Sequence, residues 1–153
     1  MVAKVCEKID IAAQRYSGLS RRAIDYGLFQ KRLMDRAKSN DYSPDEWEGL
    51  REFVADDFQR IGNFKEVMSF DEMIGFLQRW CVDSHWEGSF KRVVEHDNVV
   101  WLELEERVTY EGHTNVVNSV TVYEFNAAGK LRHLDVYLQM APPQGLPSEA
   151  YKG

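Results

Sequence analysis

The chain has little of what marks several classes of protein. Its 153 residues include two cysteines, Cys6 and Cys81, which form no CxxC motif. We therefore expect free thiols in a reducing compartment rather than a disulfide framework or a zinc site. No apolar run reaches the roughly 18 residues that span a bilayer, and charged residues between positions 4 and 10 interrupt any apolar signal segment. These features predict a soluble, cytoplasmic protein with no membrane partner.

Clustered positive charge is also missing. The net charge is −6, and no segment gathers Lys and Arg as phosphate binding requires, so we expect no nucleic-acid partner. The chain has four histidines, and no pair of them has metal-ligand spacing with a carboxylate. It also has no glycine-rich phosphate loop and no nucleophile elbow. We therefore predict neither a metal ion nor a cofactor.

The first half of the chain is expected to be helical. Its length of 153 residues fits a single domain over residues 1–153. Two Ser-x-x-Glu capping boxes, at Ser43 and Ser69, begin two of the helices. The tail from about 141 to 153 contains two glycines and three prolines and is expected to be loose. Apolar spacing predicts helices over Val2–Tyr16, Ser20–Ala37, Ser43 to about Asp56, and Ser69–Val82.

The last third is rich in β-branched and aromatic residues. Turns at Gly112 and Gly129 separate its runs, which predicts an antiparallel meander. Helices followed by strands indicate an α+β domain, in which N-terminal helices pack in the concave face of a curved antiparallel β-sheet. Such a cup binds small molecules. The expected strands are Trp86–Val94, Val99–Tyr110, Asn115–Asn126 and Leu131–Met140, after a shorter extended run at Phe58–Phe64.

Three phrases carry a resemblance to a known family. They are Phe53-Val54-Ala55-Asp56-Asp57, Tyr110-Glu111-Gly112, and the run from Tyr123 to Leu131 with its Asn-Ala-Ala-Gly turn. Over roughly residues 20 to 140 the chain resembles the cone-shaped α+β barrels of ketosteroid isomerase, scytalone dehydratase, the SnoaL-like polyketide cyclases and nuclear transport factor two. The resemblance implies a homodimer and a pocket for a small hydrophobic substrate. The scaffold hosts many reactions, so it does not assign one.

The residues that carry steroid isomerisation in this family are missing at the matching positions. Gly62 stands at the position of the family's general-base aspartate, and Thr121 stands at the position of its oxyanion-hole aspartate. The position of the tyrosine expected on the first helix of the family lies near Arg32 or Leu33 in this chain, and Tyr26 lies about two turns earlier. If the chain is an enzyme, it performs different chemistry in the same cup.

Side chains alternate along strands, so the register that the resemblance implies assigns each one to a face. The concave face is expected to hold Leu102, Leu104, Glu106, Val108, Tyr110, Val117, Ser119, Thr121, Tyr123, Leu134, Val136 and Leu138. The opposite face is expected to hold Trp101, Glu103, Glu105, Arg107, His133, Asp135 and Tyr137. Its aromatic residues suit the contact between the two protomers of a homodimer.

Glu106 is the carboxylate that this register places among aliphatic neighbours in the cup. Burial disfavours the charged form of a carboxyl group, and such groups in clefts are often catalytic. We therefore predict Glu106 as the general acid or base. A β-bulge that moved the register by one residue would instead turn Glu105 inward and leave Glu106 in solvent.

Two further residues are candidates for catalysis. Arg60 is expected to face inward, where it pairs with Glu106 or binds an oxyanion; the alternative is a surface arginine at a strand edge. Tyr26 can donate a hydrogen bond to a substrate oxygen, or it is a core residue with a satisfied hydroxyl. The predicted substrate-binding residues are Trp80, His85, Leu104, Val108, Ser119, Thr121, Tyr123, Leu134 and Val136.

These residues predict a cofactor-independent lyase or isomerase that uses acid–base proton transfer in an apolar pocket. Its substrate is expected to be hydrophobic and aromatic, with dehydration or retro-aldol-type cleavage favoured. The alternative is a non-catalytic ligand-binding or dimerisation module of the same fold. An open cavity with buried polar groups favours the enzyme, and a cone filled by side chains favours the module.

Overall fold

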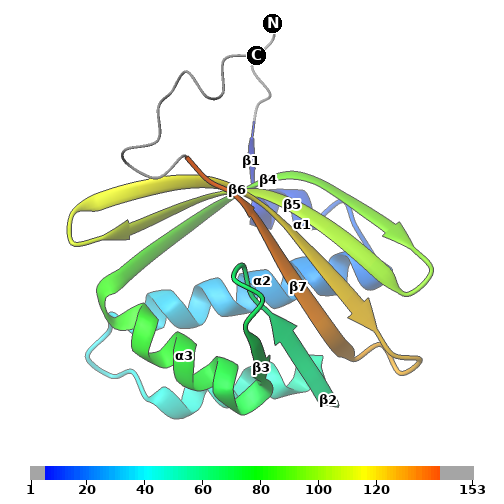
Figure 1. The fold of residues 1–153 in the computed structure, drawn as a ribbon, viewed down its shortest axis with the longest axis horizontal. Helices are drawn as coiled ribbons and strands as arrows, with labels where there is room; N and C mark the ends of the chain where they lie inside the picture. The colour runs from blue at the N-terminus through cyan, green and yellow to red at the C-terminus, as the bar shows by residue number, and fades with distance from the viewer. Residues whose placement is uncertain (1–5, 142–153) are drawn as a thin grey trace, which may run out of the picture.

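A computed structural model describes residues 6–141 of the chain (Figure 1). The helical elements are α1 (Ile9–Ala13), α2 (Gly18–Arg36), the 3-10 helix η1 (Pro44–Phe53) and α3 (Phe70–Asp83). The strands are β1 (Glu7–Lys8), β2 (Val54–Ile61), β3 (Val67–Ser69), β4 (Ser84–His96), β5 (Val99–Tyr110), β6 (His113–Phe125) and β7 (Leu131–Gln139).

The strands of the described residues form one seven-stranded sheet in the order β1-β4-β5-β6-β7-β2-β3. Strands β4 to β7 form the antiparallel meander that the sequence predicts. Two of its hairpins turn at Gly112 and Gly129, whose φ angles of 78° and 73° lie in the left-handed region that favours glycine. The expectation of an antiparallel sheet is wrong at one pair, because β2 runs parallel to β7. Parallel neighbours need a long connection, and here α3 and the meander supply it.

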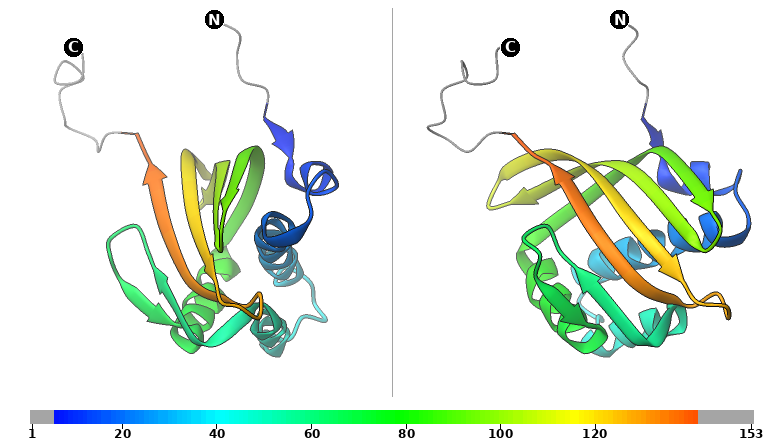
Figure 2. Two further views of the ribbon diagram at one scale, coloured as in Figure 1. Left: turned by 90° about the vertical axis from the view of Figure 1, so that its right-hand side faces the viewer. Right: turned by 45° about the vertical axis from the view of Figure 1, so that its right-hand side comes forward.

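The sheet curves around the helices, which lie on its concave side (Figures 1 and 2). Helix α2 contacts β4 and β5, and α3 contacts β2, β3 and β4. Between the two layers lies a core with fully buried side chains from both, such as Ile24, Trp47, Leu102 and Phe125. This is the α+β cone that the sequence predicts.

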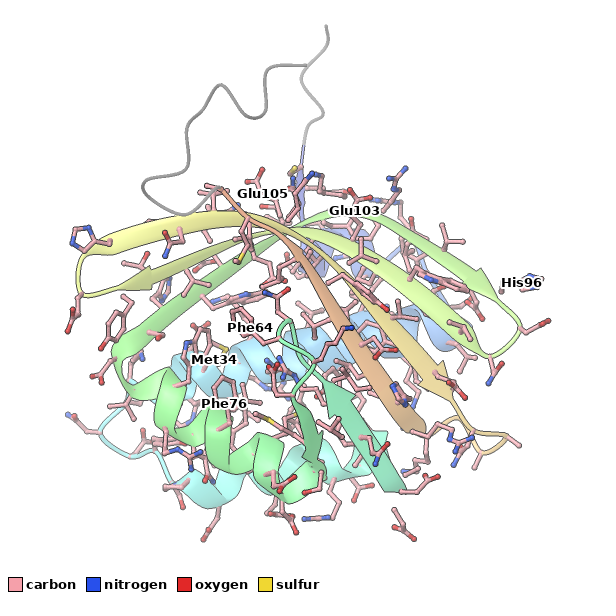
Figure 3. All side chains as sticks on the ribbon, in the orientation of Figure 1. Met34, Phe64, Phe76, His96, Glu103 and Glu105 are labelled. Atoms are coloured by element: carbon pink, nitrogen blue, oxygen red, sulfur yellow. The ribbon has the colours of Figure 1, made fainter. Side chains whose placement is uncertain are left out.

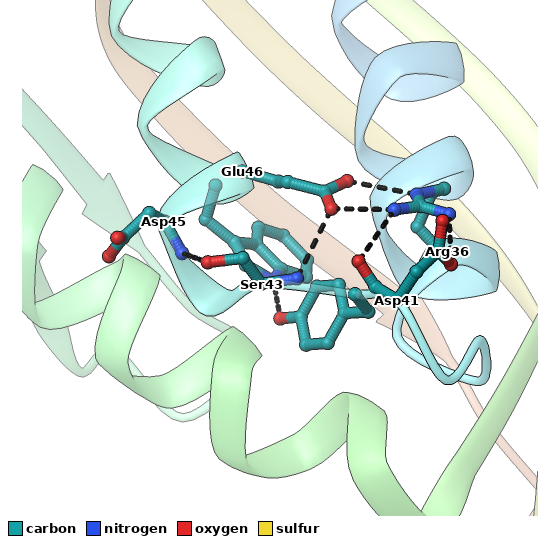
Figure 4. A network of polar contacts seen from close by, with 7 residues as sticks. Arg36, Asp41, Ser43, Asp45 and Glu46 are labelled. Atoms are coloured by element: carbon teal, nitrogen blue, oxygen red, sulfur yellow. Dashed lines mark hydrogen bonds and ion pairs between the residues drawn. The ribbon is translucent and has the colours of Figure 1, made fainter.

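Both predicted capping boxes are present. The Ser69 hydroxyl accepts from the Glu72 backbone N–H, while the Glu72 carboxylate accepts from the Ser69 N–H. Ser43 and Glu46 make the same arrangement at the start of η1. Glu46 also accepts from the Arg36 guanidinium at 2.7 and 3.0 Å, which joins η1 to the end of α2 (Figure 4).

The structure corrects several predicted boundaries. The helix expected over Val2–Tyr16 is much shorter in the described residues, because residues 7 and 8 instead pair with β4 as strand β1. The third predicted helix is a 3-10 helix, and Asp56 belongs to β2 rather than to the helix end. The predicted tail lies outside the described residues beyond position 141. Within the described part of the chain, no helix is both long and apolar enough to cross a membrane.

Candidate functional site

Two adjoining cavities open between the helices and the concave face of the sheet. The inner cavity has a volume of about 130 Å³ and the outer one about 810 Å³. Arg60, Trp86 and Glu106 line both, so they mark where the two cavities meet. The cone is therefore not filled by side chains, and its open space contains charged groups.

Glu106 lies on β5 and points into the cup. Its Oε2 atom accepts a hydrogen bond of 2.7 Å from the Trp86 indole Nε1 on the neighbouring strand β4. Its other oxygen, Oε1, has no protein hydrogen-bond partner among residues 6–141. On the opposite face, Glu105 pairs with Arg107 at 2.9 Å, and Figure 3 shows Glu103 and Glu105 on the outer side of the sheet. The register predicted for β5 is therefore confirmed.

A glycine makes room for the indole that holds Glu106. Gly88 pairs with Glu106 across the β4–β5 ladder. A Cβ atom at position 88 would lie 2.5 Å from the Cη2 atom of Trp86 and 2.8 Å from the Cδ1 atom of Ile9. Any larger residue would push the indole out of its place. The missing side chain thus lets Trp86 lie close to the strand and reach the carboxylate.

Arg60 lies on β2 and faces the same cavities. Its Nη1 atom is buried and has no hydrogen-bond partner among the described residues. Its ion-pair partner, Oε1 of Glu66, lies 3.7 Å from Nη1, beyond hydrogen-bond distance. The guanidinium carbon lies 6.0 Å from the centre of the Phe76 ring. No ion pair joins Arg60 to Glu106 in residues 6–141, so the two charged groups that line both cavities do not neutralise each other directly.

Two tyrosines form the inner end of the site. The rings of Tyr26 and Tyr123 meet edge to face, with centroids 6.0 Å apart. Burial raises the pKa of Tyr26, against a smaller lowering effect from Arg60. Burial also raises the pKa of Tyr123, and Tyr26 and Glu106 add to that rise. Both phenols therefore stay neutral. The Tyr26 hydroxyl lies 3.5 Å from the Met73 sulfur, a weak acceptor, so it can donate to a better one.

Most of the predicted substrate-binding residues line these cavities. Leu104, Thr121, Tyr123 and Leu134 line the inner one, and Trp80 and Val108 line the outer one. Val136 lines both. Their common position follows from the alternation of side chains along β5, β6 and β7.

Two of the predicted site residues lie elsewhere. His85 lines neither cavity: its ring bonds to the Glu87 carboxylate at 2.9 Å and is exposed. The reason is alternation along β4, because Trp86 faces inward and its neighbour therefore faces outward. Ser119 also lines neither cavity: it is 1% exposed, and its hydroxyl oxygen has no hydrogen-bond partner among residues 6–141.

The sequence reasoning missed Trp86 and Phe64. Trp86 was recognised only as the start of a strand, because nothing anchored the register of β4. Counting back from β5 across the hairpin would not have found it either, because a bulge between Phe90 and Arg92 shifts the pairing by one residue. Phe64 lines the outer cavity, yet its side chain is 82% exposed. The polar turn around it gave no sign of a binding role.

The described residues contain no group of three or more His, Cys, Asp or Glu side chains that could hold a metal ion. The polar groups of the site are one carboxylate, one guanidinium, the Lys31 ammonium group, the Gln30 amide, an indole N–H and a few hydroxyls. Such a set can move a proton and stabilise a negative oxygen.

The sequence matches no protein-family model and no curated protein. Solved structures do match. An NTF2-like protein of unknown function from Burkholderia pseudomallei is 13% identical, with a TM-score of 0.59 over 77% of this chain and 91% of that one. A proposed SnoaL-like polyketide cyclase from Jannaschia sp. CCS1 is 15% identical, with a TM-score of 0.55 over 81% and 90%. An LEH-like epoxide hydrolase from M. tuberculosis is 13% identical, with a TM-score of 0.54 over 73% and 84%.

Proposed function

We propose that this chain, which has the NTF2-like, SnoaL-like cone fold, is a cofactor-independent enzyme acting on a hydrophobic small molecule. Its reaction is an isomerisation or the elimination of a small molecule, driven by proton transfer. One observation carries the proposal: Glu106 and Arg60 line the same open cavities without pairing with each other.

Glu106 is the proton carrier in this proposal. The Trp86 indole holds one carboxylate oxygen at 2.7 Å, which fixes the direction of the other. The neighbouring inward residues of β5, Leu104 and Val108, are aliphatic, so little else competes for the proton. A positioned acid or base of this kind contributes about 10²- to 10⁴-fold in rate.

Arg60 stabilises the charge that proton removal creates. When Glu106 takes a proton from a carbon next to a carbonyl group, the electron pair moves onto the carbonyl oxygen and forms an enolate. The buried Nη1 of Arg60 has donor capacity for that oxygen. The enolate then regains the proton at another carbon, or it expels a leaving group from the β-carbon. The first route is an isomerisation and the second is an elimination.

The size and lining of the outer cavity support a hydrophobic substrate. Its volume of about 810 Å³ lies within the range of pockets for drug-sized ligands. Phe76 and Trp80 from α3 and Val108 from β5 give it an apolar wall. Solved structures with this fold include one named an epoxide hydrolase and one named for polyketide cyclisation, both of which are small-molecule activities.

The test begins with a thermal-shift screen over aromatic and polycyclic ketones and hydroxyketones, because a bound ligand raises stability by mass action. Each hit is then incubated with the protein and followed by mass spectrometry. An isomer or a product lighter by a lost small molecule supports the proposal. Ligands that bind in the cavity but are never converted would instead support the non-catalytic binding module.

A matched pair of variants shows whether turnover depends on the site. Glu106→Gln should lower kcat by about 10²- to 10⁴-fold, whereas Glu105→Gln, one residue away on the outer face, should leave it unchanged. Both variants must keep the native unfolding midpoint within a few degrees. Turnover by Glu106→Gln at the native rate would remove Glu106 from the mechanism.

A further inference from the structure

The two cavities differ in chemistry. Of the two cavities, Tyr26, Lys31 and Thr121 line only the narrow inner one, so polar groups from both the helix and the sheet face it, while Gln30, Arg60 and Glu106 line both. The outer cavity is six times as large by volume, about 810 against 130 Å³, and its wall is mostly aliphatic and aromatic. This arrangement suits a ligand with a large apolar body in the outer cavity and a small polar end directed at the inner one.

The charge of that polar end follows from Arg60. Burying a guanidinium N–H without an acceptor is costly, and most buried donors in proteins have a partner. Arg60 keeps Nη1 buried with no partner among residues 6–141. The other cation lining the inner cavity, Lys31, is already engaged, since its Nζ lies 2.7 Å from Asp35 and 3.3 Å from Glu87. Of these two cations, Arg60 is thus the one whose carboxylate partner, Glu66, lies beyond hydrogen-bond distance.

Glu66 lies close to Arg60 but accepts no hydrogen bond from its Nη1 atom. Its carboxylate folds back over Gly62, where a Cβ atom would lie 1.7 Å from Glu66 Oε1. Its other oxygen accepts from the Phe64 backbone N–H at 2.9 Å. This turn holds Glu66 Oε1 at 3.7 Å from Arg60 Nη1, beyond hydrogen-bond distance. Glu66 therefore lowers the positive potential at Arg60 without occupying the donor.

We infer that the ligand of this site is an organic anion: a hydrophobic body with one carboxylate or phenolate oxygen that pairs with Arg60. The body lies in the outer cavity against Phe76 and Trp80, with Phe64 at its exposed side. Glu106 limits the ligand to a single charged end, because a second negative group nearby would be repelled. The inference rests on the proposed function for the location of the site and adds the charge and orientation of its ligand.

The experiment compares three probes that share a naphthalene body: 2-naphthoate, 2-naphthol and the neutral 2-naphthalenemethanol. Their dissociation constants are measured by isothermal titration calorimetry, with tryptophan fluorescence as a second readout because Trp80 and Trp86 line the cavity. At pH 7 we expect 2-naphthoate to bind about 10- to 100-fold more tightly than the alcohol, the strength of a charge-assisted hydrogen bond. Tighter binding of 2-naphthol above its own pKa would extend the inference to phenolates, and its absence would restrict the ligand to carboxylates.

Three variants separate this inference from its alternatives. Arg60→Gln should abolish the preference for 2-naphthoate while still binding the alcohol. Arg132→Gln removes an exposed guanidinium that pairs with Asp57. It should change neither the preference for 2-naphthoate nor the affinity for the alcohol. Glu66→Gln should tighten 2-naphthoate by about two- to fivefold, because one partly screened negative charge is removed. An arginine with only a structural role would not give weaker naphthoate binding in Arg60→Gln together with tighter naphthoate binding in Glu66→Gln.

Equal affinities for 2-naphthoate and the alcohol would overturn the inference, and so would an unchanged preference in Arg60→Gln or no naphthoate binding at millimolar concentration. The proposed function fails differently. Glu106→Gln should lose turnover yet bind 2-naphthoate at least as tightly as the native protein. Anion binding without any turnover would refute the proposed enzymatic function but would still support an organic anion as the ligand.

Discussion

The Trp86 indole Nε1 donates a hydrogen bond of 2.7 Å to Glu106 Oε2 across strands β4 and β5. The two residues are diagonal neighbours on the concave face, because Glu106 pairs with Gly88 and Trp86 pairs with Val108. An indole N–H can donate but cannot accept, so it orients a carboxylate without taking a proton from it. Trp86 is therefore a positioning residue for the proposed proton carrier.

Trp86→Phe tests that role. The phenyl ring keeps the apolar contact and removes the donor, so we expect kcat to fall by about 10-fold, the effect of one hydrogen bond to a charged group, while KM changes little. Steady-state kinetics on the substrate found by screening measures both. A drop in kcat as large as that of Glu106→Gln would mean that Trp86 does more than orient the carboxylate.

Gly88→Ala probes the same contact through packing. The new methyl group would lie 2.5 Å from Trp86 Cη2, so the indole must move. Overpacking of this kind costs about 1 to 3 kcal/mol in the free energy of unfolding, and kcat should fall as well. Urea titration measures the first effect.

The matched control for that variant is Gly75→Ala on α3. Its new methyl group would meet only the end of the flexible Arg79 side chain, at 3.3 Å. Alanine is the better helix former, so stability should rise by about 0.5 to 1 kcal/mol. Equal destabilisation by both variants would show that position 88 has no special packing.

The ion pair between Arg36 and Glu46 predicts an acid-sensitive step in stability. Hydrogen bonds from Arg36, and next from the Ser43 backbone, lower the pKa of Glu46 from its usual 4.5 to about 2. A carboxyl with a lowered pKa in the folded state stabilises the protein above pH 4.5, and that contribution is lost as the pH falls towards 2. Thermal unfolding at pH 7 and pH 3 should therefore show a smaller difference for Glu46→Gln than for the native protein.

Arg36→Gln is the companion variant. Because Arg36 is the largest cause of the shift, its removal should also flatten the pH dependence, and the double variant should add little to either single one. Full additivity of the two changes would contradict the pairing.

The outer face of the sheet predicts a homodimer. Trp101 is 37% exposed and Tyr137 is 60% exposed on that face, and large aromatics are enriched in interfaces between chains. Light scattering should give twice the monomer mass at micromolar concentration, and Tyr137→Glu should shift the mass towards the monomer. A monomeric native protein would refute this prediction.

Catalysis without a metal or cofactor predicts that dialysis against EDTA leaves the turnover rate unchanged. The measurement is kcat before and after dialysis, with the same protein supplemented by Mg²⁺ or Zn²⁺ as the comparison. Lost activity that returns with one divalent ion would show that a metal takes part.

Local sequence signals predicted the meander and both capping boxes because each depends on residues close together in the chain. The inward position of Glu106 followed from the register that the family resemblance implies for the hairpin at Tyr110-Glu111-Gly112. The register of β4 was harder to predict, since a bulge between Phe90 and Arg92 breaks its alternation. His85 was expected at the pocket mouth from its place at the junction of helix and strand, with no register to show that Trp86 faces inward instead.

Long-range features lay beyond the sequence. Strand β1 is two residues long and β3 three, too short for any periodic pattern to identify. The parallel pairing of β2 with β7 joins segments about 75 residues apart, as in the pair Arg60 and Leu134. The unsatisfied Nη1 of Arg60 depends on where Glu66 is held, which only the three-dimensional structure shows.

The position of β2 gives the two sides of the site unequal local stability. Glu106 lies on β5, which long strands border on both sides, while Arg60 lies on β2, whose outer neighbour β3 has three residues and forms the sheet edge. Short edge strands open at a lower free energy than central ones. Amide hydrogen exchange should therefore be faster around Arg60 than around Glu106, and a ligand that pairs with Arg60 should slow it there first.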